Sequence, residues 1–494
     1  MFKAKLLASS VLFFSSLVSA DIFKADSQFT NQEYSAAYEG YLAASKLGNP
    51  HAHYQLANMY MKGLGVEQDM ISAILYYALA AEYDFHNANA VLQSIYDSLP
   101  EETVSEVSKL IDGYIAQHGK VSINNAYFPV ILEDKLSTKI MFGEDTVPQT
   151  KFYSEEVELQ DYFDEFEDEE GNISLEINAL TPPQPPILVI DHDIHWDGSV
   201  RHTEQLQKYG GTFDGTRELM DGIANYPLEV PTFDGKPVEF LSRAYMGAAV
   251  YDKFTLVRRY ENAYEQILRQ SNRLKTDPSL NAQYQYATAL INFPWLKQDE
   301  GEAERILASL ANLGHSPAML EYGLLLYREQ RELPAAIHWI AESAKYGLTR
   351  AEYRLGKLLQ SSPWVFTDDS KALFWFELAA QDGHVQATLR AIEILLLSNN
   401  ENIRNPITAS SYLDSIAESQ ARNPEYFYLR AQLLRQAEEK DFKQIFDDFR
   451  QAILLGNQLN WDVSDWQALL DRMMQGNITI GDEGLCEDND EQCG

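Results

Sequence analysis

A repeated pattern of small residues constrains this chain more than any other feature of its sequence. Each copy has an Ala, a residue eleven positions later that is often Gly, and a residue fifteen positions later that is usually Ala. The copies form two blocks, and within a block they begin 33 to 37 residues apart. A fixed period of this size predicts stacked pairs of helices. The copies are Ala37, Gly48 and Ala52; Ala73, Asp84 and Ala88; Ala303, Gly314 and Ala318; Ala336, Gly347 and Ala351; Ala372, Gly383 and Ala387; and a degenerate copy at Ala409, Gln420 and Pro424.

The spacing within a copy predicts a helix and its end. Ala372, Trp375, Ala379 and Gly383 lie three or four residues apart, which places them on one helical face. Small side chains on that face let a second helix approach closely, and Gly383 is typical of a helix C-terminus with left-handed backbone. We therefore predict a mainly α fold built from two α-solenoid blocks, an architecture that usually binds proteins.

The second copy resembles the Sel1-like repeats, a branch of the tetratricopeptide superfamily. That family has a Leu-Gly-x-x-Tyr helix, a Gly-x-Gly-Val turn and an Ala-x-x-Trp/Tyr helix that closes with Ala-Ala. The chain follows this order with Leu56-Ala-Asn-Met-Tyr60, Gly63-Leu-Gly65-Val66, Ala73-Ile-Leu-Tyr76 and Ala80-Ala81, although Ala57 replaces the usual Gly. The resemblance covers residues 30–98 and 260–456. It implies a superhelical solenoid whose concave face holds a protein partner, and it implies no catalytic residue and no cofactor.

Four aromatic residues at one repeat position are candidates for contacts with that partner. Trp339 and Trp375 lie 36 residues apart, and Tyr76 and Tyr412 hold the same position in other copies. We place all four on the first helix of each pair, which we expect to line the concave face, and large aromatics are frequent interface anchors. The alternative is that they are buried spacers, since most aromatics at helical spacing belong to a core.

The segment between the two blocks has a different pattern. Alternating residues of 188–197 predict an amphipathic strand, Asp197-Gly198 a hairpin turn, and residues 199–206 the returning strand. Residues 213–224 predict a helix, and Gly235-Lys236-Pro237-Val238 leads into a last strand through Leu241. This order resembles the C-terminal domain of TonB-type proteins over residues 185–255. The resemblance implies a small α/β domain that contacts envelope proteins partly by strand pairing.

The histidines of this strand do not predict a metal site. His192 and His195 are surrounded by Asp191, Asp193 and Asp197, but strand alternation points the two imidazoles to opposite faces. Two histidines without a convergent third ligand are a weak metal signal. We also find no His-Glu-x-x-His, no Gly-x-Ser-x-Gly and no phosphate-binding loop. The sequence therefore predicts no metal, no cofactor and no enzyme.

The first twenty residues predict export. Lys3 and Lys5 precede an apolar stretch over residues 6–18, and Val18-Ser19-Ala20 is a small-residue cleavage pattern that makes Asp21 the first mature residue. An uncleaved anchor is the alternative, but the apolar stretch is short for a span of about 20 residues. We expect a periplasmic protein without an integral membrane segment after cleavage, with a secreted or membrane-peripheral location as alternatives.

Charge and cysteine usage fit an exported protein that binds proteins. A net charge of −35 repels nucleic acid and anionic lipid. Residues 155–170 hold ten acids, which predicts a solvated loop, with a contact for a basic partner or a loose divalent-cation site as alternatives. The two cysteines, Cys486 and Cys493, lie close together in the last stretch of the chain, and in an oxidising compartment we expect them to form a disulfide.

These observations predict six segments. They are a signal peptide (1–20), N-terminal helical repeats (21–118), a linker with the acidic loop (119–184), the α/β domain (185–255), C-terminal helical repeats (256–475) and an acidic tail (476–494). We expect a non-catalytic periplasmic scaffold or adaptor for envelope proteins of unknown identity. The alternatives are a carrier or chaperone for exported clients and, from another class, a hydrolase with a site between domains.

Overall fold

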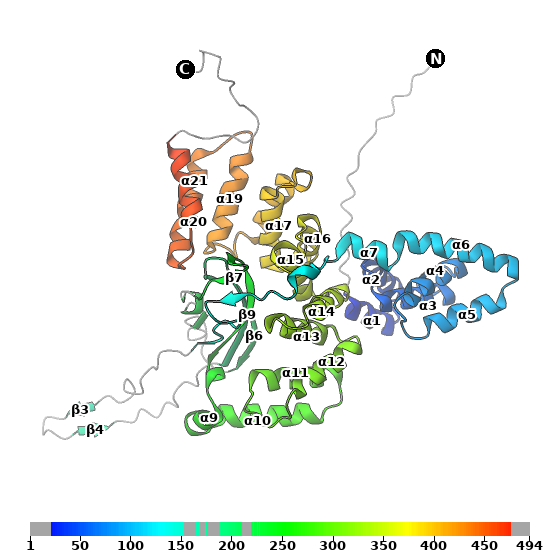
Figure 1. The fold of residues 1–494 in the computed structure, drawn as a ribbon, viewed down its shortest axis with the longest axis horizontal. Coiled ribbons are helices and arrows are strands. Elements are labelled where there is room, and N and C mark those ends of the chain that lie inside the picture. Colours follow the sequence, from blue (N-terminus) through cyan, green and yellow to red (C-terminus); the bar gives the residue numbers. More distant parts are fainter. Residues whose placement is uncertain are drawn as a thin grey trace, which may run out of the picture. The chain divides into compact units, whose positions relative to one another are not determined.

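The computed structural model of the protein describes residues 21–152, 165–167, 173–175, 187–209, 219–220, 222–224, 226 and 228–475 (Figure 1). The expected signal peptide, most of the acidic loop, the start of the helix expected at 213–224, and Cys486 and Cys493 lie outside these residues. The chain divides into two compact units, of which the first contains Met1–Pro129 and Ala341–Glu352 and the second the remainder. In the described part of the chain, we find no helix with both the length and the apolar character needed to cross a membrane.

In the described residues of the first unit before Pro129, all regular secondary structure is helical. Local signals set the helix starts: Asn49 caps α3 with Pro50 in its first turn, and the Asp69 carboxylate accepts a hydrogen bond from the backbone N–H of Ile71 at the start of α4. The helices are α1 (Ile22–Thr30), α2 (Tyr34–Lys46), α3 (Pro50–Lys62), α4 (Met70–Ala81), α5 (Ala88–Ser98), α6 (Glu101–His118) and α7 (Lys120–Tyr127).

The second unit contains a central sheet and a long series of helices. Helices α14 and α15 contribute to both units. The helices are α9 (Lys253–Arg259), α10 (Glu261–Thr276), α11 (Leu280–Asn292), α12 (Glu302–Asn312), α13 (Ser316–Arg328), α14 (Leu333–Lys345), α15 (Thr349–Ser361), α16 (Asp369–Gln381), α17 (Val385–Leu397), α18 (Pro406–Ile416), α19 (Pro424–Gln436), α20 (Phe442–Gln458) and α21 (Ser464–Met474). Short 3₁₀ helices are η1 (Glu133–Lys135), η3 (Ala248–Val250) and η4 (Glu401–Ile403).

The predicted repeat is confirmed by burial and by backbone conformation. Every alanine that defines a copy is at most 9% exposed. The residue eleven positions after the first Ala has a positive φ in the first five copies, at Gly48, Asp84, Gly314, Gly347 and Gly383. This left-handed conformation ends one helix and turns the chain into the next. Gln420 of the sixth copy does not share it, which agrees with the degenerate sequence there.

Two glycines let neighbouring repeat helices touch. A Cβ added at Gly323 of α13 would lie 2.9 Å from the carbonyl oxygen of Ala336, and one at Gly356 of α15 would lie 2.6 Å from the ring of Phe376. Gly323 and Gly356 are 33 residues apart and occupy the same repeat position. The helices thus cross too closely for any side chain at this position.

The central strands form one four-stranded sheet and two smaller ones among the described residues. The large sheet has the order β2-β9-β5-β6, in which β5 is antiparallel to both neighbours and β2 is parallel to β9. The strands of this sheet are β2 (Lys151–Phe152), β5 (Ile187–Ile194), β6 (Val200–Tyr209) and β9 (Phe240–Gly247); β1 (Met141–Phe142), β7 (Pro231–Phe233) and β8 (Lys236–Pro237) form a second sheet, and β3 (Glu165–Glu167) pairs with β4 (Ile173–Leu175).

The hairpin predicted at Asp197-Gly198 is present, because β5 pairs with β6 across this turn and Gly198 has a φ of 80°. The strand predicted to end at Leu241 is different. Lys236–Pro237 pairs with β7 as a short strand, and the long strand β9 begins only at Phe240. The two-residue strand β2, from the segment expected to be a linker, also joins the large sheet. The resemblance to TonB C-terminal domains stays a prediction.

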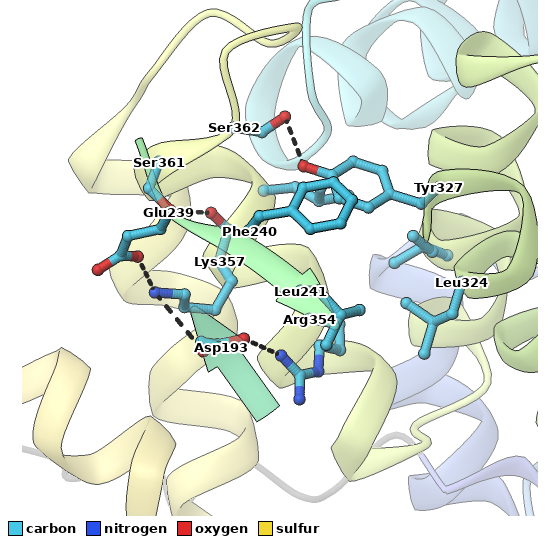
Figure 2. Close-up of a pocket in the computed structure, with 12 residues that line it drawn as sticks. Asp193, Glu239, Phe240, Leu241, Leu324, Tyr327, Arg354, Lys357, Ser361 and Ser362 are labelled. Carbon is cyan, nitrogen blue, oxygen red and sulfur yellow. Dashed lines mark hydrogen bonds and ion pairs between the residues drawn. The ribbon is translucent and has the colours of Figure 1, made fainter. Parts of the chain in front are cut away.

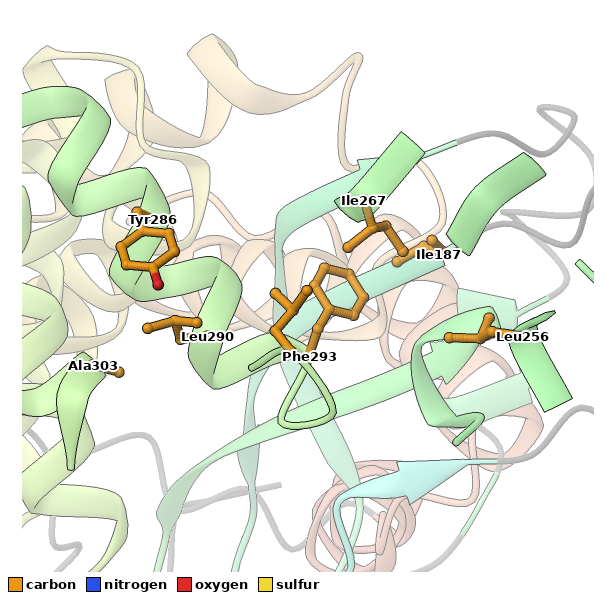
Figure 3. Close-up of a cluster of buried hydrophobic side chains, with 8 residues drawn as sticks. Ile187, Leu256, Ile267, Tyr286, Leu290, Phe293 and Ala303 are labelled. Carbon is orange, nitrogen blue, oxygen red and sulfur yellow. The ribbon is translucent and has the colours of Figure 1, made fainter. Parts of the chain in front are cut away.

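An apolar cluster joins the sheet to the first helices of the second unit. Ile187 at the start of β5 and Leu256 of α9 pack in this cluster with Ile267, Tyr286 and Phe293 of α10, α11 and the loop that follows (Figure 3). All five side chains are at most 5% exposed. This packing fixes one end of β5 on the helices by the hydrophobic effect. The rest of β5 is held by buried ion pairs, which are described below.

Candidate functional site

Strand β5 carries the residues that distinguish the second unit. The sequence predicts one apolar face and one solvated polar face, and this prediction is wrong: all eight residues of β5 are buried. Asp191 is 0% and Asp193 is 2% exposed. The polar face is buried because helices of the C-terminal repeats cover it and supply charged partners. Buried carboxylates are tolerated only when they are paired in this way.

The first charged group centres on Arg243 of β9, which stands opposite Asp191 in the sheet. Its Nε lies 2.8 Å from Oδ1 of Asp191, and its two terminal nitrogens lie 2.6 and 3.0 Å from the carboxylate of Glu321 on α13. Arg328 of α13 donates to the same carboxylate at 3.2 Å. Burial raises the pKa of Glu321, but the guanidinium groups of Arg243 and Arg328 outweigh it and hold this pKa below its usual value.

The second charged group centres on Asp193. Arg354 of α15 places Nη1 2.6 Å from Oδ1 of Asp193, and Nδ1 of His202 on β6 lies 3.1 Å from Oδ2. The hydroxyl of Tyr353 donates to Oδ2 at 3.3 Å. Burial raises the pKa of Asp193, but the cations of Arg354 and Lys357 more than offset it and leave this pKa well below the usual range.

The contacts continue to both sides of Asp193. Lys357 of α15 pairs with Glu239, which also accepts from Nε2 of His195 at 2.9 Å. Asp197 in the hairpin turn lies 2.9 Å from Nη2 of Arg201, whose guanidinium stacks 3.9 Å above the ring of Trp461.

On the other side, Nε2 of His202 lies 3.4 Å from Glu425 of α19, and Arg390 of α17 pairs with that same carboxylate. Burial lowers the pKa of His202 to about 4, so its imidazole is neutral near pH 7. Helices α13, α15 and α19 therefore contact the polar face of the sheet, and α17 is linked to it through Glu425 of α19. We call this face, with its helix partners, the charged joint.

The helix side of the charged joint follows the repeat. Glu321, Arg354 and Arg390 are separated by 33 and 36 residues, which are also the intervals between Ala303, Ala336 and Ala372. The same position of α13, α15 and α17 thus carries a charge that faces the sheet. Sequence reasoning missed this signal, although charged residues in phase with a row of buried alanines are visible without a structure.

A small cavity lies within the charged joint. Figure 2 shows Asp193, Glu239, Arg354 and Lys357 on its polar side, with Phe240 and Tyr327 among its apolar walls. The space open to the centre of a water molecule is about 30 Å³. This volume holds one or two waters, because one water needs at least about 10–15 Å³ on this measure. A drug-sized ligand needs several hundred Å³, so the cavity does not fit an organic substrate.

The acidic side chains of the charged joint are paired with cations. Asp193, Glu239, Glu321 and Glu425 each lie against a guanidinium or ammonium group, which leaves none of them as a free base. These ion pairs hold the sheet on the helices. Among the residues that the structure describes, no three His, Cys, Asp or Glu side chains are placed to hold a metal ion.

His192 and His195, which were weighed as metal ligands, have different surroundings. His195 contacts Glu239 and lies 3.4 Å from Asp197, whereas neither ring nitrogen of His192 has a hydrogen-bond partner. Burial lowers the pKa of His192 to about 4. His192 is therefore a neutral core residue of the sheet.

The four candidate aromatics lie on α4, α14, α16 and α18. Trp375 is fully buried at 0% exposure, so it is a core spacer and not a surface anchor. Trp339, Tyr76 and Tyr412 are half-buried. Trp339 lies 6.1 Å from the ring of Tyr322, and the hydroxyl of Tyr412 is 3.4 Å from Glu377. The helices of the charged joint are the other set, α13, α15, α17 and α19, so these aromatics do not line the face where the sheet binds.

Comparison with known proteins finds similarity to one repeat family. Two segments, residues 50–82 and 349–384, match the Sel1 repeat family. These segments correspond to α3 with α4 and α15 with α16, so the first helix of each pair is α3 or α15. Tyr76 and Trp375 lie on the second helix of each matched segment. Each of these two segments is similar to one Sel1 repeat.

Solved structures with similarity include a Sel1 repeat protein from Oxalobacter formigenes and yeast Tom70. The first is 13% identical with a TM-score of 0.25, and the match covers 80% of this chain and 96% of that one. The second is 14% identical with a TM-score of 0.25, and the match covers 88% of this chain and 76% of that one. No curated protein matches the sequence.

Proposed function

We propose that this protein is a non-catalytic adaptor of the bacterial cell envelope that joins proteins through its helical repeats. The observation that carries the proposal is the charged joint, in which first helices of the C-terminal repeats bind a folded sheet through in-phase charged residues. A repeat array that binds a sheet of its own chain uses the same surface with which such arrays bind other proteins. The sheet and these helices then form one body on which partners assemble.

The proposed location is the periplasm. The basic, apolar and small-residue stretches of residues 1–20 support export with cleavage after Ala20. The resemblance of residues 185–255 to TonB C-terminal domains supports contact with an envelope protein. Intact-mass measurement of the purified protein tests the cleavage: a chain that begins at Asp21 and is released by periplasmic extraction is expected. Retention of Met1, or membrane association that survives a carbonate wash, would contradict it.

The adaptor function is tested by affinity purification with crosslinking from an envelope fraction. A small set of partners recovered in stoichiometric amounts is the expected result. Many weakly bound exported proteins would favour the carrier function instead. Recovery of no protein above the level of an unrelated acidic control would refute both, and turnover in a broad hydrolase screen would overturn the non-catalytic assignment.

A further inference from the structure

Two successive helices of the second unit carry positive charge in an otherwise acidic chain. Helices α9 and α10 hold six Lys and Arg and two Glu, a net charge of +4, whereas the whole chain has a net charge of −35. Figure 1 shows them at the start of the helical series of this unit. A positive surface attracts acidic segments within a Debye length, which is about 10 Å at 0.1 M salt. All six cations are exposed; they are Lys253, Arg258, Arg259, Arg269, Arg273 and Lys275.

One side of α9 also exposes apolar side chains. Phe254 is 72% and Val257 is 43% exposed, and Arg258 lies on the same side because the three are three or four residues apart. Leu256 on the opposite side is 0% exposed and packs in the apolar cluster of Figure 3. This packing fixes α9 with its exposed side outward. We call Lys253, Phe254, Val257 and Arg258 the basic face of α9.

The chain contains a segment with the complementary pattern. Residues 155–170, which we call the acidic segment, hold ten Asp and Glu and no Lys or Arg, with Tyr162, Phe163 and Phe166 among the acids. Its carboxylates match the cations of α9, and its aromatic rings match the exposed apolar side chains there. An exposed ion pair contributes little by itself, so the two kinds of contact have to act together.

Both ends of the loop that contains the acidic segment lie near α9. Phe152 of β2 pairs with Met246 of β9. Ile187 of β5 pairs with Gly247, the last residue of β9. Helix α9 begins seven residues after Met246, and an extended chain spans at most about 3.6 Å per residue, so its start lies within about 25 Å. Acids from Asp161 onward, nine or more residues beyond Phe152, can reach it. A tether of this kind gives an effective concentration on the order of millimolar.

We propose that the acidic segment binds the basic face of α9 within the same chain. Its carboxylates pair with Lys253 and Arg258, and its aromatic side chains pack on Phe254 and Val257. An acidic segment of another protein then has to displace it before it can use this face. The contact does not depend on the adaptor function, because both of its sides belong to this chain.

Anisotropy of a labelled peptide with the sequence of residues 155–170 tests this contact on two full-length chains. One is the unchanged protein, and the other, the amide chain, has Asn and Gln in place of the ten acids of the acidic segment. We expect saturable binding to the amide chain. Binding to the unchanged protein should be at least about tenfold weaker, because its own tethered segment occupies the face. Added salt should weaken binding to the amide chain, since exposed charges are screened.

A second comparison locates the binding on α9. In the amide chain, Lys253→Gln with Arg258→Gln should weaken binding of the peptide about three- to tenfold, as expected for the loss of two exposed ion pairs. Lys443→Gln with Arg450→Gln is the matched control, because these are two exposed cations on one helix, α20. The control should bind like the amide chain, and thermal melts confirm that both double variants fold.

Equal binding of the peptide to the amide chain and to the unchanged protein would overturn the proposal. If that binding were still lost with Lys253→Gln and Arg258→Gln, the basic face would instead take an acidic segment of another protein. Equal loss in the α20 control, or no saturable binding to the amide chain, would also overturn it. Failure to capture envelope partners would refute the adaptor function and leave these results unchanged.

Discussion

Arg354 and Asp193 form a buried ion pair at 2.6 Å although 161 positions separate them in the sequence. Each side chain is only 3% exposed. The pair links a repeat helix, α15, to the central strand of the sheet, β5. Each partner would be a costly buried charge without the other. The charged joint therefore makes the sheet and the C-terminal repeats depend on each other for stability.

Asp193→Asn is expected to lower the free energy of unfolding by about 3–5 kcal/mol, because it leaves Arg354 buried beside a neutral amide. Urea denaturation followed by circular dichroism measures the change. Glu265→Gln is the control, since Glu265 pairs with Arg269 at 3.1 Å on the surface of α10, where both side chains are about half or more exposed. That variant should lose no more than about 0.5 kcal/mol. Equal effects of the two changes would show that the joint does not hold the sheet.

The free energy of unfolding should decrease as the pH is lowered, over two separate pH ranges. Burial lowers the pKa of both His192 and His202 to about 4, against about 6.5 in an unfolded chain. Between these values the unfolded chain binds protons that the folded protein does not, so the free energy of unfolding decreases as the pH falls from about 6.5 to about 4. The pKa values of Asp193 and Glu239 are also lowered, and the stability they contribute is lost below the unfolded values of about 3.9 and 4.3.

Urea midpoints measured from pH 7 to pH 3 check both windows. His202→Gln should remove about one proton from the difference in proton binding between the unfolded and folded states. The slope of the free energy of unfolding against pH should then decrease by at most about 1.4 kcal/mol per pH unit in the upper range. A midpoint that stays constant from pH 6.5 to pH 4.5 would contradict the burial of neutral histidines.

Trp375→Ala should destabilise the second unit by about 3–5 kcal/mol, because the indole is fully buried in α16. Trp339→Ala at the same repeat position should cost clearly less, since that indole is half-buried. Thermal melts of the two variants measure the difference. Equal melting temperatures would mean that the repeat position, and not burial at each site, determines the role of these residues.

Glycine replacements should act in opposite directions at two helical sites. Gly323→Ala forces a methyl group against the carbonyl oxygen of Ala336 and the backbone of Ile340, so a loss of about 1–3 kcal/mol is expected. Gly113 of α6 has nothing within 4 Å of an added Cβ. Gly113→Ala should therefore stabilise the protein by about 1 kcal/mol through helix propensity alone. Calorimetry of both variants checks the signs, and a stabilising Gly323→Ala would contradict the close crossing of α13 and α14.

The helices could be predicted from the sequence because their signals are local. Ala372, Gly383 and Ala387 lie within sixteen residues, and the backbone of Gly383 and the burial of both alanines are as expected. The polar face of β5 could not be predicted in the same way. Asp193 reads as a solvent-facing residue of an amphipathic strand, and its burial depends on α15, which lies far along the chain.

The aromatic candidates show another limit of prediction from the sequence. Trp375 and Trp339 have the same residue type at the same repeat position, and the pattern treats them alike. One is buried and the other is half-buried because the neighbouring repeats differ. A repeat pattern gives the average environment of a position, whereas a binding site depends on how each copy departs from that average.

The charged face of β5 also affects the newly made chain. Strands β5, β6 and β9 are complete at Gly247, whereas the helices that cover them extend from Ser316 to Gln436. The sheet is thus synthesised well before its cover. An apolar face left open for that interval would attract other unfinished chains, but Asp191, Asp193 and Arg243 are hydrated in water. This face of the nascent sheet therefore stays hydrated until the helices of the charged joint close over it.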